Sequence, residues 1–378
     1  MSDDDFPQPD RLEGAPHPRE TAHLIGQDAA RDAFLAAYSS DRLHHGWLIS
    51  GPKGVGKATL AWQIARFLIA APPAQDDGLF GAPPPPSSLQ IDAEHPVARR
   101  MMAGSEPSLF VLKRPYDEKL KRLKQDITVD EVRKLKGFFA LSAADGGHRV
   151  VIVDSADEMN VNAANALLKL LEEPPKDTTL LLVSHQPSRL LPTIRSRCRE
   201  LRLSPLAPDQ VAQALAQAGQ DGTQAAALST LAGGSVGEAI TLLTLDGVKL
   251  YADLVNLFAT CPNMNRAHAL KLADSAAGRT NTARFDLLLG LMDLFLARVA
   301  RTGAAMPPVP ANDAEPAVLS KLAPSPYAAR QWASLQQDLS ARARHGRAVN
   351  LDPSALILDM VLKIDQTAAK LAAQQGAA

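Results

Sequence analysis

A glycine-rich stretch near the start of the chain has the spacing of a phosphate-binding loop. Residues 51–57 read Gly-Pro-Lys-Gly-Val-Gly-Lys, and its glycines are Gly51, Gly54 and Gly56. Glycines let backbone N–H groups approach phosphate oxygens closely, and a helix that begins at the loop adds a favourable dipole. Lys57 would reach the β- and γ-phosphates. The spacing therefore predicts a nucleoside-phosphate site, against the alternative of a glycine-rich turn without a ligand.

The metal-binding half of this site is altered. The residue after the lysine normally carries a hydroxyl that holds Mg²⁺, and here it is Ala58. Thr59 has a hydroxyl and is a candidate for nucleotide binding, but one position along a helix is a rotation of about 100°. Thr59 therefore cannot simply replace the missing group. We expect ATP or ADP to bind weakly, with the need for Mg²⁺ left open.

A carboxylate follows the apolar run 150–153, at Asp154. Beside a phosphate-binding loop, an acid at the carboxyl end of a strand is typical of the aspartate that holds Mg²⁺. The alternative is a helix N-cap. In active ATPases of this kind the next residue is usually a glutamate that activates water, and here it is Ser155. Ala58 and Ser155 together predict a nucleotide site without efficient hydrolysis.

The elements that must position these residues alternate along the first half of the chain. Three continuous apolar runs, at 47–50, 149–154 and 178–184, are typical of buried parallel strands. Helical patterns fall between them, at 56–70 and 162–173. Strands that alternate with helices predict a parallel α/β sheet. After Pro205 only helical patterns remain, short ones over 206–245 and longer amphipathic ones over 250–300 and 326–375.

Composition excludes several classes of protein. The 378 residues are 46% apolar, and 40 basic residues balance 41 acidic ones, which does not support a strongly basic nucleic-acid binder. Two cysteines, Cys198 and Cys261, are too few for a disulfide scaffold or a four-cysteine zinc site, so no zinc is expected. No apolar run approaches the ~18 residues of a membrane span. The first 20 residues are acidic and lack the apolar stretch of a secretory signal. We expect a cytoplasmic protein with a disordered leader over 1–20.

Two further stretches carry a specific resemblance. Residues 165–175 read Asn-Ala-Leu-Leu-Lys-Leu-Leu-Glu-Glu-Pro-Pro, and residues 190–198 read Leu-Leu-Pro-Thr-Ile-Arg-Ser-Arg-Cys. Together with the phosphate-binding loop, they resemble the clamp-loader subunits of bacterial DNA polymerase III, in the AAA+ superfamily. The resemblance starts near Ile25 and is firm through Leu206. It implies a hetero-pentamer with delta and gamma/tau subunits that loads the sliding clamp onto primed DNA during replication.

The resemblance also implies a division into domains and a role for one arginine. It implies a RecA-like AAA+ domain over 21–205, a helical lid over 206–247 and an all-α collar domain over 248–378. In that family the arginine of Ser-Arg-Cys acts on the ATP site of a neighbouring subunit. Ser196, Arg197 and Cys198 are therefore the expected partner-facing residues, with Arg197 acting catalytically in trans. The alternative for Arg197 is a structural arginine at a helix end.

Three departures favour the delta-prime type over the ATP-hydrolysing gamma/tau type. They are Ala58, Ser155 and a glycine, within 234–237, where gamma/tau carries a sensor 2 arginine. We expect a largely non-hydrolysing stator within the DNA polymerase III holoenzyme, a DNA-directed DNA polymerase. One alternative is an active gamma/tau-type ATPase or another AAA+ motor. A second is a collar protein with a vestigial loop.

Other features carry weaker expectations. Ser184 or His185, at the polar end of the run 178–184, is a candidate sensor 1 residue. Cys198 is interpreted as a small buried apolar residue rather than a nucleophile. The basic run 113–136 could contact DNA phosphates, although a solvated helix face of mixed charge is the favoured interpretation. The proline-rich stretch 71–88 predicts a surface loop or an insertion.

Overall fold

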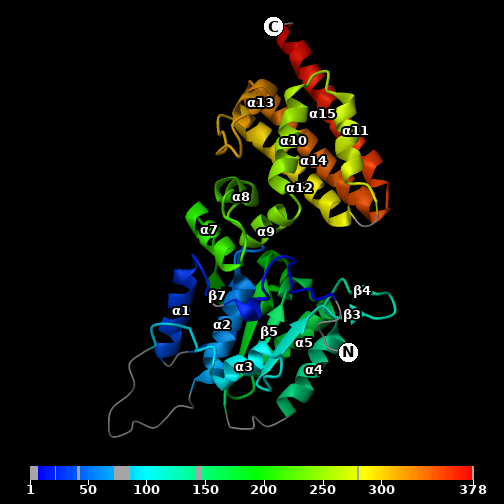
Figure 1. Ribbon diagram of the computed structural model, residues 1–378. Helices are drawn as coiled ribbons and strands as arrows, with labels where there is room; N and C mark the ends of the chain where they lie inside the picture. Colours follow the sequence, from blue (N-terminus) through cyan, green and yellow to red (C-terminus); the bar gives the residue numbers. More distant parts are fainter. Residues whose placement is uncertain are drawn as a thin grey trace. The chain divides into compact units, whose positions relative to one another are not determined.

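The computed structural model (Figure 1) describes residues 7–21, 23–40, 43–71, 86–140, 147–278 and 281–376. The chain forms two compact units. Unit 1 comprises Met1–Asp221 and Gly234–Glu238, and unit 2 comprises Gly222–Gly233 and Ala239–Ala378. The predicted boundaries of the AAA+ domain, lid and collar stay a prediction.

A five-stranded parallel sheet is the centre of unit 1. Its strands are β1 (Gly46–Ser50), β2 (Leu109–Lys113), β5 (Arg149–Asp154), β6 (Thr178–Ser184) and β7 (Arg199–Arg202). They lie in the order β2-β5-β6-β1-β7, and all four neighbouring pairs are parallel. Strands β1 and β6 are buried along their whole length, which explains their continuous apolar sequences. The predicted α/β class is confirmed.

Helices cover both faces of this sheet (Figure 1). The helices of unit 1 are α1 (Asp28–Ser39), α2 (Lys57–Ala70), α3 (Pro96–Met102), α4 (Val129–Ala140), α5 (Val161–Glu172), α6 (Pro192–Arg195) and α7 (Pro208–Gln217). Val151 and Val153 of β5 share a core with Leu135 of α4 and Leu167 of α5. Helix α2 packs on β1, β5 and β6. Successive residues of a strand face opposite sides of the sheet. No described residue of α2 belongs to the core that α4 and α5 share with β5, so α2 covers the other face.

A small hairpin replaces part of the helix expected in the basic run 113–136. Its strands are β3 (Tyr116–Asp117) and β4 (Arg122–Leu123), and the run is helical only from Val129 onward. The interpretation as one mixed-charge helix face is therefore wrong for its first half. Of the proline-rich stretch 71–88, residues 72–85 lie outside the described residues, so that interpretation stays a prediction.

The leader is ordered where the structure describes it, which corrects the expectation of disorder. Residues 1–6 lie outside the described residues, but Asp10 and His17 have side chains only 3% exposed. Asp10 accepts two hydrogen bonds from Lys113, at 2.8 and 3.0 Å. Composition predicted disorder because the segment is acidic and rich in proline. A few long-range contacts that composition does not show hold it on the sheet.

Unit 2 contains helices joined by loops, with no strand among its described residues. Its elements are α8 (Ala225–Ala232), most of α9 (Val236–Thr244), α10 (Gly247–Ala259), α11 (Arg266–Ser275), α12 (Thr282–Gly303), α13 (Glu315–Leu322), α14 (Pro326–Ala348) and α15 (Pro353–Gly376). Phe295 of α12, Phe258 of α10 and Trp332 of α14 are fully buried. Among the described residues no single helix is long and apolar enough to cross a membrane, although the bent pair α8 and α9 passes the same test of length and composition.

Candidate nucleotide site and the Ser-Arg-Cys corner

The phosphate-binding loop connects β1 to α2, as its sequence predicts. Gly51, Gly54 and Gly56 have φ angles of 143°, 76° and 99°. Residues with a side chain rarely adopt such backbone angles, so all three positions favour glycine. At Gly51 space adds a second reason, because a Cβ there would lie 2.5 Å from the carbonyl oxygen of Leu203. The three glycines thus allow the tight turn between β1 and α2.

Lys57 begins α2 and points back into the loop. Its Nζ donates to the carbonyl oxygen of Gly51 at 2.7 Å and to that of Pro52. Only 3% of Lys57 is exposed, and burial lowers its pKa to about 8, while the charge of Asp154 opposes the fall. Lys57 and Asp154 are thus close enough to interact electrostatically.

The acidic side of the site contains a hydrogen-bonded chain. Ser155 Oγ donates to Asp154 Oδ1 at 3.1 Å, and His185 Nε2 lies 3.1 Å from the same hydroxyl oxygen. Burial, followed by the charge of Lys57, lowers the pKa of His185 to about 4, so its ring is neutral at pH 7. Burial raises the pKa of Asp154 to about 6, and the charge of Asp10 adds to the rise. The structure thus brings the sensor 1 candidate His185 to Ser155.

The residues present suit phosphate better than Mg²⁺. The three glycines and Lys57 supply the loop geometry and the cation that a phosphate chain needs. The side chain of Ala58 offers no oxygen, and half-buried Thr59 is the next residue along α2. Ser155 offers a hydroxyl where a catalytic carboxylate would lie. The predicted phosphate site therefore keeps its glycines and its lysine, but it lacks the usual hydroxyl ligand of Mg²⁺ and the usual base for hydrolysis.

The start of α9 packs directly on the loop. The Gly237 N–H donates to the Gly54 carbonyl oxygen at 3.0 Å. A Cβ on Gly237 would lie 3.0 Å from Gly54 Cα, and a Cβ on Gly54 would collide with Ser235 Oγ. A glycine therefore occupies the expected sensor 2 region for a steric reason. Sequence patterns showed the missing arginine but not this contact.

Gln27 is a site residue that motif reasoning missed. Its side chain is 5% exposed and donates to the carbonyl oxygens of Val55, at 3.2 Å, and Ser204, at 2.8 Å. The Ser204 N–H donates back to Gln27 Oε1 at 3.2 Å. This amide ties the loop to the chain after β7. A polar residue just before a helix gave only a weak sequence signal for that role.

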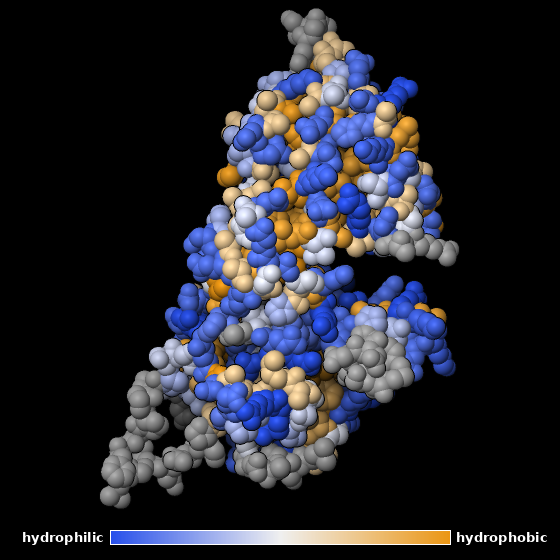
Figure 2. All heavy atoms as spheres, in the orientation of Figure 1, coloured by the Kyte–Doolittle hydropathy of each residue, from blue (hydrophilic) through white to orange (hydrophobic). Residues whose placement is uncertain are grey.

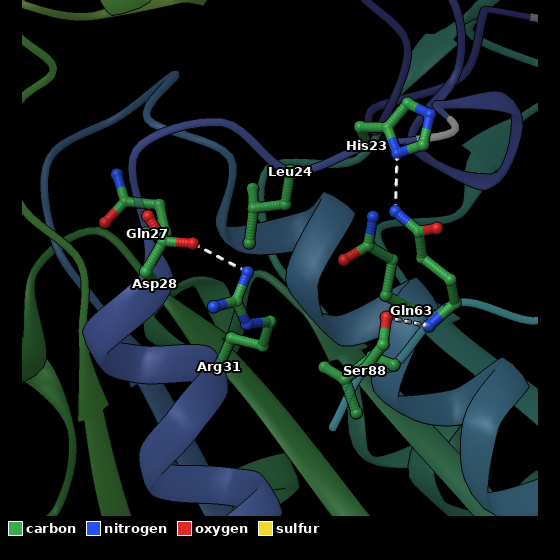
Figure 3. Close-up of a pocket in the computed structure, with 9 residues that line it drawn as sticks. His23, Leu24, Gln27, Asp28, Arg31, Gln63 and Ser88 are labelled. Atoms are coloured by element: carbon green, nitrogen blue, oxygen red, sulfur yellow. Dashed lines mark hydrogen bonds and ion pairs between the residues drawn. The ribbon is translucent and has the colours of Figure 1, made fainter. Parts of the chain in front are cut away.

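A shallow pocket beside α1 holds none of the predicted site residues (Figure 3). It is lined by His23, Leu24, Gln27, Asp28, Arg31, Gln63, Ser88, Leu89 and Gln90. His23 and Gln90 hydrogen-bond across it at 2.6 Å, and Asp28 pairs with Arg31 at 2.6 Å. Its volume of about 50 Å³ suits only water-sized molecules. We assign it no role in the chemistry.

Ser196, Arg197 and Cys198 form a corner between α6 and β7. Arg197 Nη2 lies 2.9 Å from Glu172 Oε1, and its Nη1 donates to the Thr193 carbonyl oxygen at 3.1 Å. Ser196 Oγ donates to the same carbonyl oxygen. Burial raises the pKa of the Cys198 thiol to about 12, which fits a packing role and not a nucleophile.

Arg197 lies near the amino ends of the strands, whereas the chain's own phosphate loop lies at their carboxyl ends. Arg199 is the register partner of Trp47, near the amino end of β1. A Cβ on Gly46 would lie 3.1 Å from the Arg197 carbonyl oxygen. The loop leaves the carboxyl end of β1, so about four strand residues, or roughly 13 Å, separate the two sites. Arg197 is thus placed away from its own phosphate loop.

The sheet order, the loop and the packed α9 define a P-loop NTPase domain of the AAA+ type. Residues 26–207 match the family model described as DNA polymerase III, delta subunit. Over this region the chain is similar to the delta-prime subunits of bacterial DNA polymerase III.

Individual relatives agree with this assignment. The chain is 47% identical over 154 residues to DNA polymerase III subunit delta' of Pseudomonas aeruginosa, covering 41% of each protein. It is 32% identical over 217 residues to subunit delta' of Escherichia coli, covering 57% of this chain and 59% of that one. Subunit gamma/tau of Mycobacterium tuberculosis is 28% identical over 207 residues, which cover 53% of this chain and 31% of that protein. The chain thus matches less than two thirds of each relative's length.

Proposed function

We propose that this chain is the stator of a clamp loader and supplies Arg197 in trans to the ATP site of a neighbouring subunit. The position of Arg197 carries the proposal. The arginine lies beside the amino end of β1, whereas the chain's own loop follows the carboxyl end. An arginine finger stabilises charge on a transferring phosphoryl group, and here that group belongs to the neighbour.

The chain itself hydrolyses little or no ATP. Ala58 removes the usual Mg²⁺ ligand, and Ser155 replaces the usual base and is hydrogen-bonded to Asp154. Gly237 takes the region of a sensor 2 arginine and packs on Gly54. ATP or ADP binds weakly at the loop, mainly through its glycines and Lys57. Asp154 retains one carboxylate of the usual Mg²⁺ site.

Unit 2 provides the assembly surface of this proposal. Its helices form a separate compact unit, and Figure 2 shows hydrophobic side chains at the surface of this unit on the face drawn. Its exposed large apolar side chains include Leu270, Met306, Val309, Tyr327, Val349, Leu351 and Leu362. The partners are delta and gamma/tau subunits in a cytoplasmic hetero-pentamer. The sliding clamp and primed DNA are contacted through that complex.

Reconstitution tests this function. The full chain is mixed with delta and gamma/tau subunits, and the size and ATP hydrolysis of the mixture are compared with those of the isolated chain. We expect one complex that hydrolyses ATP and an isolated chain with negligible turnover. Turnover by the isolated chain at the rate of a working ATPase, about 1 s⁻¹ or more, would instead support a gamma/tau-type enzyme or another motor.

A further inference from the structure

The two motifs that flank β6 meet in one ion pair. Glu172 ends α5 in the first motif, and Arg197 follows α6 in the second, 25 residues later. The Arg197 guanidinium has two anchors, Glu172 Oε1 at 2.9 Å and the Thr193 carbonyl oxygen at 3.1 Å. Two anchors on one planar group fix its direction more strongly than either anchor alone.

The backbone next to each residue of this pair is hydrogen-bonded and lies beside buried residues. Leu171, beside Glu172, is 1% exposed, and its carbonyl oxygen accepts a hydrogen bond from His45 Nε2 at 2.9 Å. The Arg197 N–H donates to the carbonyl oxygen of Ile194, which is fully buried. The backbone under each side chain is therefore held by the core.

The exposure of the pair shows what it can contribute. The Arg197 and Glu172 side chains are 38% and 43% exposed. Ion pairs this exposed add little to stability. They can still restrict a long side chain, which lowers the entropy lost when that side chain meets a phosphate. We propose that Glu172 is a positioning residue that orients Arg197 for the neighbouring ATP site, an inference that rests on the proposed function.

A double-mutant cycle in the rebuilt complex tests this role. Glu172→Ala should lower clamp- and DNA-stimulated hydrolysis by about threefold or more, through a lower kcat. Glu172→Gln keeps one oxygen for Arg197 and should retain an intermediate rate. Glu173→Ala removes the exposed neighbouring carboxylate and serves as the control, with the wild-type rate expected. All variants should keep the wild-type melting temperature.

The Arg197→Ala background separates the two claims. If Glu172 acts through Arg197, Glu172→Ala should cause no further loss in that background. If Arg197→Ala itself has no effect, the proposed function fails. If Arg197→Ala lowers hydrolysis but Glu172→Ala does not, or lowers it equally in both backgrounds, only the positioning role is overturned.

A second, independent observation concerns residues 7–21, here termed the N-terminal strap (dark blue in Figure 1). Asp10 binds Lys113, the last residue of β2 and the register partner of Asp154. Leu12 lies beside Gly237, 3.6 Å from where a Cβ would stand. The His17 ring packs edge-on against Trp62 of α2. The strap thus crosses the carboxyl edge of the sheet, where the phosphate loop opens.

The strap lies before the matched family region, which begins at residue 26. It places the Asp10 carboxylate on Lys113, the register partner of Asp154, so this lysine at the carboxyl edge of the sheet is already paired and not free to attract a polyanion. Gln220 Nε2 donates to the Gly14 carbonyl oxygen at 2.6 Å and ties down the middle of the strap. We infer that the strap restricts the access of nucleoside di- and triphosphates to the loop.

Affinity for a fluorescent ADP analogue tests the strap in the full chain. The double variant Asp10→Ala with Leu12→Ala should bind about tenfold tighter than wild type, and adding Lys57→Ala should abolish that gain. Leu120→Ala, an exposed apolar change on the hairpin, is the control. If the double variant does not fold, Leu12→Ala alone serves instead. Leu12 is already 37% exposed, so this single variant should fold, and it should give part of the gain in affinity. Unchanged affinity in a folded strap variant would overturn the inference and leave the role of Arg197 untouched.

Discussion

The Gly237 N–H donates to the carbonyl oxygen of Gly54 over 3.0 Å, and this contact joins the start of α9 to the phosphate loop. The two glycines approach so closely that a Cβ on Gly237 would lie 3.0 Å from Gly54 Cα. In the ATP-hydrolysing relatives that the sequence resembles, an arginine is expected in this region. Restoring an arginine here therefore conflicts with the backbone of the loop.

We predict that Gly237→Arg destabilises unit 1 and does not create an ATPase. The new side chain must displace loop backbone, at a cost of about 1–3 kcal/mol. Gly137→Ala is the control, since nothing lies within 4 Å of a Cβ at that helical position, and alanine should stabilise by about 0.5–1 kcal/mol. Urea unfolding gives both values. A Gly237→Arg variant as stable as wild type would show that the contact is not close in solution.

Lys57→Ala should abolish nucleotide binding, because Lys57 is the cation that points into the loop. Thr59→Ala should leave the affinity for ADP within about twofold of wild type, since Thr59 is rotated by about 100° around α2 from position 58, where the hydroxyl is expected. Calorimetric titration with ADP, with and without Mg²⁺, measures both variants. A large loss in Thr59→Ala would show that this hydroxyl replaces the one missing at Ala58.

Asp154→Asn should stabilise the protein at neutral pH. Because the pKa of Asp154 is raised to about 6 in the folded state, its protonated form favours folding fully below 3.8, and this contribution is lost as the pH rises through 6. The unprotonated carboxylate then lowers stability at pH 7.5 by about 3 kcal/mol. Urea unfolding of both proteins at pH 7.5 and pH 4 checks this. An equal gain at both values would rule out the carboxylate charge as its source.

Unit 2 depends on a buried ion pair. Glu315 is fully buried and accepts hydrogen bonds from Arg298 Nε at 2.5 Å and from Tyr251 Oη at 2.6 Å. Glu315→Ala leaves Arg298 buried without its carboxylate, which should lower the stability of unit 2 by about 3–5 kcal/mol. Tyr251→Phe removes one hydrogen bond and should lower it by about 1 kcal/mol.

The same two variants test the collar role. If unit 2 assembles the complex, Glu315→Ala should also reduce incorporation with delta and gamma/tau subunits, as measured by size, while Tyr251→Phe should assemble normally. Normal assembly of a Glu315→Ala chain whose unit 2 is unfolded would contradict a collar role for this unit.

Local patterns predicted the centre of the fold. Strands β5 and β6 were predictable because both of their faces are buried, which leaves a continuous apolar run in the sequence. The loop was predictable because its glycines are needed for their backbone angles.

Contacts between distant segments were not predictable from such patterns. Asp10 and Lys113 are 103 residues apart, and Gln27 and Ser204 are 177 residues apart. These four residues are common polar or charged types, and nothing in the sequence around each one indicates its distant partner. The order of the strap and the role of Gln27 therefore became visible only when the sheet brought these segments together.

Hydrolysis by complexes rebuilt with wild-type or Arg197→Ala chain tests the central claim most directly. An arginine finger is worth roughly 10³–10⁵ in rate at the site that it serves. Arg197→Ala should therefore lower clamp- and DNA-stimulated hydrolysis by at least one site's share, without changing assembly or melting temperature. Arg197→Lys should not rescue the rate, because an ammonium lacks the planar fork. Arg195→Ala, two residues earlier at the exposed end of α6, should match wild type. Equal rates for the wild-type and Arg197→Ala complexes would contradict the account and leave this chain a scaffold.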